Sequence, residues 1–250
     1  MNHGIYTALT GSLANERRLA VLTNNLANLN ASGYKRDLPL FSTVLAGQGA
    51  AAGASVGVRE QVAAAVPDVV WTDFSAGSLR VTGNPLDLAI ESDAFFAVRG
   101  AAGQVYYTRN GSFRLNGNKE LVTVNGDLVL SRQNPPRPLV VDGEDVKVSR
   151  FGEVIVDGQP VGSLRLVRFA DRQGLQKLGG LGFLPTPAAG PPQPVNEPVV
   201  AAGVLEGANV DALRAMVSLI EISREYEQQQ KVISTIGDLN QMAASEIAAV

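Results

Sequence analysis

Residues 22–36 read LTNNLANLNASGYKR, and this stretch decides how the N-terminal part of the chain folds. It closes an apolar stripe with spacings of three, four and three residues, which predicts one face of a helix over residues 4–29: Leu19, Leu22, Leu26 and Leu29. Residues 30–33, Asn-Ala-Ser-Gly, then end the helix, because Asn and Gly readily adopt the left-handed backbone conformation that terminates helices. We therefore expect a helix, a stop, and a turn at Gly33 that directs the chain outward.

A second amphipathic helix is predicted at the other end of the chain, over residues 209–249, with Asn209 or Asp211 as its cap. Its apolar positions are Val210, Leu213, Val217, Ile220, Ile222, Tyr226, Ile233, Ile236 and Leu239. At about 1.5 Å per residue the helix is about 60 Å long, which is more than a small β domain covers. We expect the two terminal helices to pair in a coiled-coil-like manner and to present a surface to other subunits. The alternative is that both helices fold onto the β domain of their own chain.

Composition narrows the possible classes of protein. The 250 residues carry a net charge of −3 and 18% charged side chains, whereas nucleic-acid binders present a basic surface, so we expect no nucleic-acid partner. The chain has no cysteine, which excludes disulfides and thiolate metal sites. Residues 38–58 are uncharged, but Pro39 and several glycines interrupt them, which argues against membrane insertion. No cleavable secretory signal is expected, because residues 1–15 contain neither Lys nor Arg.

Short strands dominate the middle of the sequence. Alternating apolar residues and Asn-Gly turns recur about every ten residues, a pattern typical of compact β domains. The expected strands cover residues 86–90, 95–98, 105–109, 112–115, 121–124, 128–130, 146–148, 154–156 and 164–169. The chain is therefore predicted to be mainly β with paired long terminal α-helices. The expected parts are a terminal-helix assembly domain at residues 1–36 and 208–250, a β domain at 71–184, and extended connectors at 37–70 and 185–207 with a short helix at 39–45.

No pattern of catalytic residues accompanies this fold. His3, the sole histidine, lies near the terminus, and the sequence lacks the G-x-S-x-G, Walker and G-x-G-x-x-G motifs. Asp87, Glu91 and Asp93 could supply the paired carboxylates of a glycan hydrolase. Asp87 and Glu91 fall on the polar positions of an alternating strand, where exposure to solvent is the ordinary explanation. We therefore predict no enzymatic activity, no cofactor and no metal site.

Several stretches resemble one known family. NNLAN at residues 24–28 and SGYKR at 32–36 are similar to the N-terminal signature of bacterial flagellar rod and hook proteins. NPLDLAIESDAFFAV at residues 84–98, YTRNGSF at 107–113 and EGANV at 206–210 also match that family. The opening residues 1–8 and residues 204–210 look most like the proximal rod members. The chain is therefore identified as a member of the flagellar basal-body rod family.

The resemblance implies a structural subunit, with several consequences for assembly. Such a subunit is exported by the flagellar type III apparatus without a cleaved signal peptide, and it stacks helically with copies of itself and other rod subunits. The terminal helices would line the export channel of a periplasm-spanning, torque-transmitting rod needed for motility. The alternatives are a distal rod or hook-type axial protein, or, in a different class, a cell-wall glycan-binding or glycan-hydrolysing β domain with an oligomerising helix pair.

The candidate functional residues are those expected at subunit interfaces on the terminal segments. Apolar members would pack between helices, and the Asn residues near the turn would make polar contacts. The set comprises Ile5, Leu9, Leu19, Leu22, Asn25, Leu26, Asn28, Leu29, Gly33, Tyr34, Lys35, Leu213, Val217, Ile220, Tyr226, Ile233 and Ile236.

Overall fold

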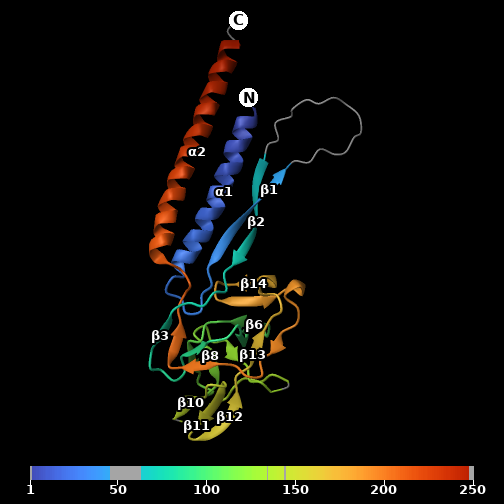
Figure 1. Cartoon of the computed structure of the whole chain (residues 1–250), viewed down its shortest axis with the longest axis vertical. Helices are drawn as coiled ribbons and strands as arrows, with labels where there is room; N and C mark the ends of the chain where they lie inside the picture. The colour runs from blue at the N-terminus through green and yellow to red at the C-terminus, as the bar shows by residue number, and fades with distance from the viewer. Residues whose placement is uncertain (1, 46–62, 134, 144, 248–250) are drawn as a thin grey trace, which may run out of the picture. The chain divides into compact units, whose positions relative to one another are not determined.

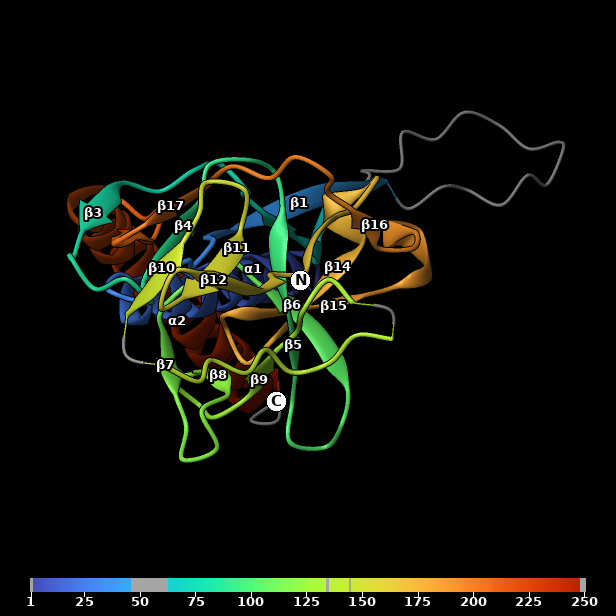
Figure 2. The same ribbon diagram turned by 90° about the horizontal axis from the view of Figure 1, so that it is seen from below.

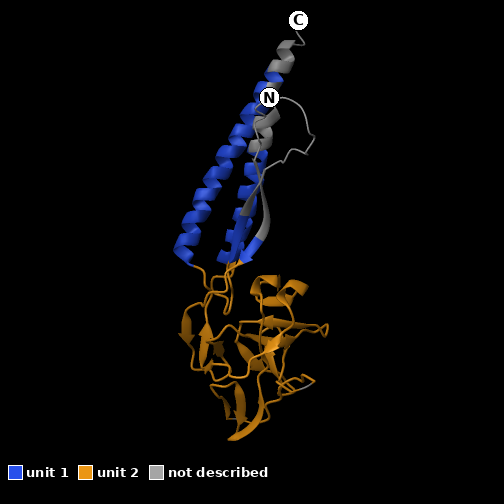
Figure 3. Cartoon of the chain, turned by 45° about the vertical axis from the view of Figure 1, so that its right-hand side comes forward, with its two compact units in different colours: residues 1–26, 37–71, 211–250 blue, residues 27–36, 72–210 orange. Residues whose placement is uncertain are grey.

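The computed structural model describes residues 2–45, 63–133, 135–143 and 145–247 of the chain (Figure 1). The chain divides into two compact units, coloured separately in Figure 3. Unit 1 comprises Met1–Leu26, Asp37–Trp71 and Asp211–Val250; unit 2 comprises Ala27–Arg36 and Thr72–Val210. The turn that follows the first helix therefore belongs to the β-rich unit, although unit 1 residues flank it on both sides.

Unit 1 contains two helices and a pair of strands. Its elements are α1 (Asn2–Ala27), α2 (Ala212–Ile247), β1 (Asp37–Leu45) and β2 (Ala63–Thr72). The prediction of two long terminal helices is confirmed. The short helix predicted at residues 39–45 is wrong, because this segment is the strand β1 paired with β2. Its Ser-Thr-Val run favours the extended conformation, since β-branched side chains lose less freedom in strands than in helices.

Asp211 caps α2, which settles the choice between the two cap candidates. Its Oδ1 accepts a hydrogen bond from the backbone N–H of Arg214 at 3.1 Å, the usual contact of an N-cap carboxylate with the first helical turn. Asn209 is engaged elsewhere, within unit 2.

Unit 2 is built from antiparallel strands (Figure 2). Within the described part of the chain, one nine-stranded sheet contains β5 (Phe95–Arg99), β6 (Val105–Thr108), β7 (Phe113–Leu115), β8 (Leu121–Thr123), β9 (Leu128–Val129), β13 (Leu166–Arg168), β14 (Leu175–Leu178), β15 (Gly182–Pro185) and β16 (Gln193–Pro194). A three-stranded sheet contains β10 (Val146–Val148), β11 (Glu153–Val156) and β12 (Gln159–Ser163). Two further pairs join β4 (Leu88–Ile90) to β17 (Val200–Ala202) and β3 (Leu79–Val81) to β18 (Val204–Glu206). Two 3-10 turns, Arg172–Gly174 and Pro187–Ala189, complete the unit.

Strand β5 lies between two hydrophobic clusters. Because successive side chains of a strand point to opposite faces, Phe96 and Val98 enter one cluster while Phe95 and Ala97 enter the other. Phe96 packs edge-on against Phe113 with ring centroids 5.0 Å apart. Unit 2 therefore has a core on both faces of its central strand, which holds the neighbouring loops in fixed positions.

Two sequence interpretations of this unit need correction. Residues 185–207 do not run as a connector throughout, because β17 and β18 pair within unit 2 and bury Val200 and Leu205. The strand expected to be half-buried is instead buried along its length, since Leu88, Ala89 and Ile90 are all covered. An apolar strand covered on both faces loses the alternation on which the prediction depended.

Neither α1 nor α2, over the part of each that the structure describes, has the length and apolar character of a membrane-spanning helix.

Candidate assembly site

The seam between α1 and α2 includes small and polar side chains contributed by α1, among them Ser12, Ala14 and Asn15. Asn15 Nδ2 donates to Gln229 Oε1, and Gln230 Nε2 donates to Ser12 Oγ, both at 3.4 Å. A Cβ atom on Gly11 would lie 2.9 Å from Gln229 Nε2, so a larger residue would push that side chain away. Ser12 contacts Gln230, whereas Arg18, further along α1, lies 3.7 Å from Glu225, which comes earlier in α2. The two helices are therefore antiparallel. Polar groups in such a seam specify the register of a helix pair and reduce its stability.

The seam face of α2 follows a repeat of alternating four- and three-residue steps. Its members are all buried or half-buried: Ala215, Leu219, Ile222, Tyr226, Gln229, Ile233 and Ile236. This spacing is the 3.5-residue repeat of helices that pack along a seam. Three predicted interface residues, Tyr226, Ile233 and Ile236, consequently lie on the contact face within unit 1.

The opposite face of α2 carries exposed apolar side chains. Leu213 is 73% exposed, Val217 48% and Ile220 52%. At 100° per residue these positions lie about half a turn around the helix from the seam. Further exposed apolar residues of unit 1 are Leu9, Leu13, Leu38, Leu40, Val70, Trp71, Met216, Val232, Leu239 and Met242. On α2 the exposed residues Leu213, Met216, Val217 and Ile220 follow one another at helical spacing, and clustered exposed apolar side chains are typical of sites of protein interaction.

The predicted interface residues on α1 and just after it fall into distinct environments. Leu9 is exposed, whereas Leu19, Leu22, Leu26, Asn28 and Leu29 are half-buried. The side chain of Ile5 lies outside the described residues.

Asn25 is buried within unit 1, where its Oδ1 accepts from the Asp37 N–H at 2.9 Å and its Nδ2 donates to the Asp37 carbonyl at 2.8 Å. Asn25 thus ties together the two chain segments on either side of the 27–36 turn.

Gly33 fits where no other residue would. Its φ is +71°, and a Cβ atom would lie 2.3 Å from the carbonyl carbon of Arg109. Its N–H donates to the carbonyl oxygen of Glu206 at 2.7 Å. The turn therefore presses against the backbone of unit 2, and the missing side chain permits that approach.

Tyr34 and Lys35, also predicted at a subunit interface, are fully buried in unit 2. Lys35 Nζ donates to Glu206 Oε1 and to the carbonyl oxygen of Ser75, both at 2.6 Å. Lys177 stands over the Tyr34 ring, with Nζ 4.5 Å from its centroid. Both predicted interface side chains thus make intramolecular contacts.

Arg109 completes a buried charged cluster around Glu206. Its Nε lies 3.3 Å from Glu206 Oε2, an ion contact without hydrogen-bond alignment, and its Nη1 donates to the carbonyls of Ser92 and Ala94. Burial lowers the pKa of Lys35, and the hydrogen bond and charge of Glu206 oppose that shift. Burial likewise lowers the pKa of Arg109. Two cations sharing one carboxylate and several carbonyls hold the turn to the strand that leads into α2.

Asn209 links three segments of unit 2. Its Oδ1 accepts from the Arg36 N–H at 2.7 Å, and its Nδ2 donates to the Asp73 carbonyl at 2.7 Å. Arg36 also pairs with the Asp73 carboxylate at 2.8 Å. The chain leaves unit 2 after Arg36, re-enters it at Thr72 and leaves it again after Val210. One amide side chain and one ion pair thus join the segments next to these three crossing points.

The carboxylates weighed for glycan hydrolysis lie in different environments. Asp87 is buried, contrary to the expectation of solvent exposure, and Asp93 Oδ1 pairs with Arg172 at 2.8 Å. Glu91 is exposed and lies beyond the intervening buried strand. Among the described residues, no group of three or more His, Cys, Asp or Glu is placed to hold a metal ion.

Three family models match separate parts of the chain. The flagella basal body rod protein model matches residues 5–35. The flagellar hook protein FlgE/F/G D1 domain model matches residues 89–156, and the flagellar basal body rod FlgEFG protein C-terminal model matches residues 201–246. The matched regions thus cover α1 with its turn, the centre of unit 2, and the strands and helix at the C-terminal end.

Curated relatives match along almost the whole chain. The flagellar basal-body rod protein FlgG of Agrobacterium fabrum is 34% identical over 265 residues, covering 96% of this chain and 97% of the relative. FlgF of Escherichia coli is 32% identical and covers 95% of each chain. FlgF of Mesorhizobium japonicum is 31% identical and covers 91% of this chain and 90% of the relative.

The terminal helices, the antiparallel β unit and the three matched regions define a structural protein of the bacterial flagellum. The chain belongs to the flagellar basal-body rod protein family, a family of structural proteins and not of enzymes. These three relatives, one named FlgG and two named FlgF, are 31% to 34% identical to this chain, so a position in the proximal rod stays a prediction.

Proposed function

We propose that this rod subunit assembles through unit 1, with the outward face of α2 packing against neighbouring subunits of the rod. The observation that carries the proposal is the second apolar face of α2, opposite the seam, on which Leu213, Val217 and Ile220 are exposed. Burying such side chains fully is worth about 1.5–3 kcal/mol each, so the exposed face gains more from a partner than from water.

The proposed assembly is helical and includes copies of the chain and other rod subunits. A contact between two different surfaces repeats without closing when its rotation is not that of a ring, and it then generates a filament. We further propose that the chain reaches its place through the flagellar export apparatus without a cleaved signal, that it lies in the proximal, periplasm-spanning rod, and that its paired helices line the channel.

Substitution on the outward face tests the proposal. Val217→Asp places a carboxylate where an apolar contact is required, and burying an unpaired charge costs several kcal/mol. We expect this variant to fold and to be missing from purified basal bodies. Ser234→Asp, also exposed on α2, is the matched control and should be incorporated. Normal incorporation and motility of Val217→Asp would refute assembly through this face.

A second experiment tests the position in the rod. If the proposal is correct, basal bodies from a strain that lacks the protein should not contain a complete proximal rod. Structures that retain a complete proximal rod and lose only distal parts would assign the chain to the distal rod instead.

A further inference from the structure

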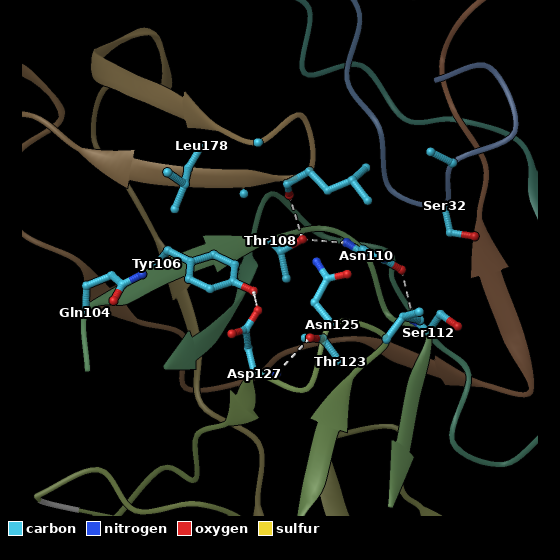
Figure 4. A pocket seen from close by; sticks show the side chains of 15 residues that line it. Ser32, Gln104, Tyr106, Thr108, Asn110, Ser112, Thr123, Asn125, Asp127 and Leu178 are labelled. Atoms are coloured by element: carbon cyan, nitrogen blue, oxygen red, sulfur yellow. Dashed lines mark hydrogen bonds between the residues drawn. The ribbon is translucent and has the colours of Figure 1, made fainter. Parts of the chain in front are cut away.

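Unit 2 contains an open pocket of about 440 Å³ on the side of the sheet formed by β6, β8 and β15 (Figure 4). Strand β6 provides Tyr106 and Thr108, the turn after β8 provides Asn125 and Asp127, and the end of β14 provides Leu178. The volume lies within the range of about 300–1,000 Å³ typical of small-molecule sites.

The polar groups of the pocket fall into two sets, one of which is already engaged. The Tyr106 hydroxyl donates to Asp127 Oδ2 at 2.6 Å, and Thr108 Oγ1 donates to the Leu181 carbonyl at 2.7 Å. Burial, with the Asp127 carboxylate beside it, raises the pKa of Tyr106, so the phenol stays protonated. These bonds fix the walls of the pocket before any ligand arrives.

The second set has no hydrogen-bond partner among the described residues of the protein. It includes the side-chain amides of Asn125 and Gln104. Figure 4 shows the Asn125 amide pointing up between Thr108 and Asn110, and Gln104 beside the Tyr106 ring at the other end. Both residues are exposed, and their two amides, at opposite ends of the pocket, can each donate and accept hydrogen bonds.

The charge of the lining excludes several ligand classes. Of the described residues that line the pocket, none is Lys, Arg or His, so a phosphate or other anion would meet no opposite charge. The same described residues include a single carboxylate, Asp127, whose Oδ2 already accepts a hydrogen bond from Tyr106, whereas cation sites usually combine several oxygen ligands. A wholly apolar ligand would bury the free amides without partners, at a cost of about 1–3 kcal/mol for each.

Apolar surface lies beside these amides. Leu178 and Val124 form part of the wall, and Gly182 lies against the Tyr106 ring, where a Cβ atom would be 2.9 Å from Cδ2. An aromatic ring and aliphatic side chains next to neutral hydrogen-bonding groups match a sugar, which has both C–H faces and hydroxyl or acetamido groups. We propose that this pocket binds a neutral oligosaccharide, with hydrogen bonds from Asn125 and Gln104 and apolar contacts to Tyr106 and Leu178.

A peptide segment from another subunit is the main competing ligand, and the sheet argues against it. Peptides commonly bind a β unit by adding a strand to a free edge. Strand β6, which forms the centre of the pocket, already pairs with β5 on one side and β15 on the other. At the centre of the pocket, where β6 pairs on both sides, a ligand therefore meets side chains, and the nearest end strand of the sheet is β14.

The test is a titration of the full chain with triacetylchitotriose and with maltotriose, followed by backbone amide chemical shifts. We expect saturable shifts in residues 104–108 and 123–127 with at least one saccharide, and no such shifts with inorganic phosphate. Asn125→Ala and Gln104→Ala should each weaken binding about three- to tenfold, the loss of one or more neutral hydrogen bonds. Asn118→Ala, in an exposed turn outside the pocket, is the matched control and should bind like the parent chain.

Several outcomes would overturn the proposal. These are an absence of saturable shifts with both saccharides at tens of millimolar, binding that both pocket variants leave unchanged, or shifts in residues 123–127 that depend on protein concentration and not on saccharide. The last result would assign the pocket to a second copy of the chain. Because the site lies in unit 2, saccharide binding should persist in Val217→Asp, so its failure and the failure of rod assembly are distinguishable.

Discussion

Replacing Lys35 by Met tests the buried charged cluster that holds the 27–36 turn. Met keeps most of the aliphatic length of the side chain but removes the ammonium group, which donates at 2.6 Å to both Glu206 and the Ser75 carbonyl. Glu206 would then remain buried with Arg109 at 3.3 Å and the Gly77 N–H at 3.0 Å. Removing one partner of a buried ion pair typically costs about 3–5 kcal/mol, and we expect a loss of that size.

Urea unfolding of unit 2 measures this loss. The transition should be followed by the amide resonances of β5 and β6, because the sole tryptophan, Trp71, lies in unit 1 and does not report on unit 2. Lys119→Met is the matched control, since Lys119 pairs with Asp142 on the surface and exposed pairs contribute about 0–1 kcal/mol. A Lys35→Met variant that loses no more stability than Lys119→Met would refute the structural role of the cluster.

Three further predictions concern the turn and the helices. Gly33→Ala should destabilise unit 2 by about 2 kcal/mol or more in thermal unfolding, because the new Cβ would meet the Arg109 backbone; a change below about 0.5 kcal/mol would contradict this. Partial burial raises the pKa of Asp73, but hydrogen bonds from Ser75 and Arg36 outweigh it, so the pKa is lowered. The pair therefore stabilises the fold above the ordinary pKa of Asp and loses that contribution as pH falls through the lowered value, which a carboxyl titration by NMR would measure; a raised pKa would be inconsistent. In dilute solution the amides of α1 and α2 should exchange faster than those of β5, because α1 contributes small and polar side chains such as Ser12 and Asn15 to the seam and buries little apolar surface there; equal protection would argue against ordering on assembly.

Local sequence patterns were enough to predict much of the fold. The helix stop near residues 30–33 and most strands between 95 and 156 agree with the structure, because Asn-Gly turns and alternating apolar residues act over short distances. Strands such as β14 and β15 were missed. They contain no Val, Ile or Thr, and pairing with β6 decides their conformation.

The buried cluster could not be predicted in the same way. Lys35 and Glu206 are 171 residues apart in the sequence, and a lysine after a glycine turn is ordinarily exposed. The sequence therefore suggested that Tyr34 and Lys35 face other subunits, whereas the fold encloses both. The only local signal was the glycine at position 33, because its positive φ and the close approach of the Arg109 backbone both favour a residue without a side chain.

Thiol accessibility is the most direct test of assembly through α2. The chain has no cysteine, so Val217→Cys introduces a single reactive thiol on the outward face. We predict rapid maleimide labelling of the free chain and at least tenfold slower labelling in purified basal bodies, with full labelling restored after denaturation. Asn118→Cys, in an exposed turn of unit 2, supplies the rate of a thiol away from the proposed contact. Labelling of Val217→Cys at the same rate in free chain and basal body would contradict the proposal that this face is buried between rod subunits.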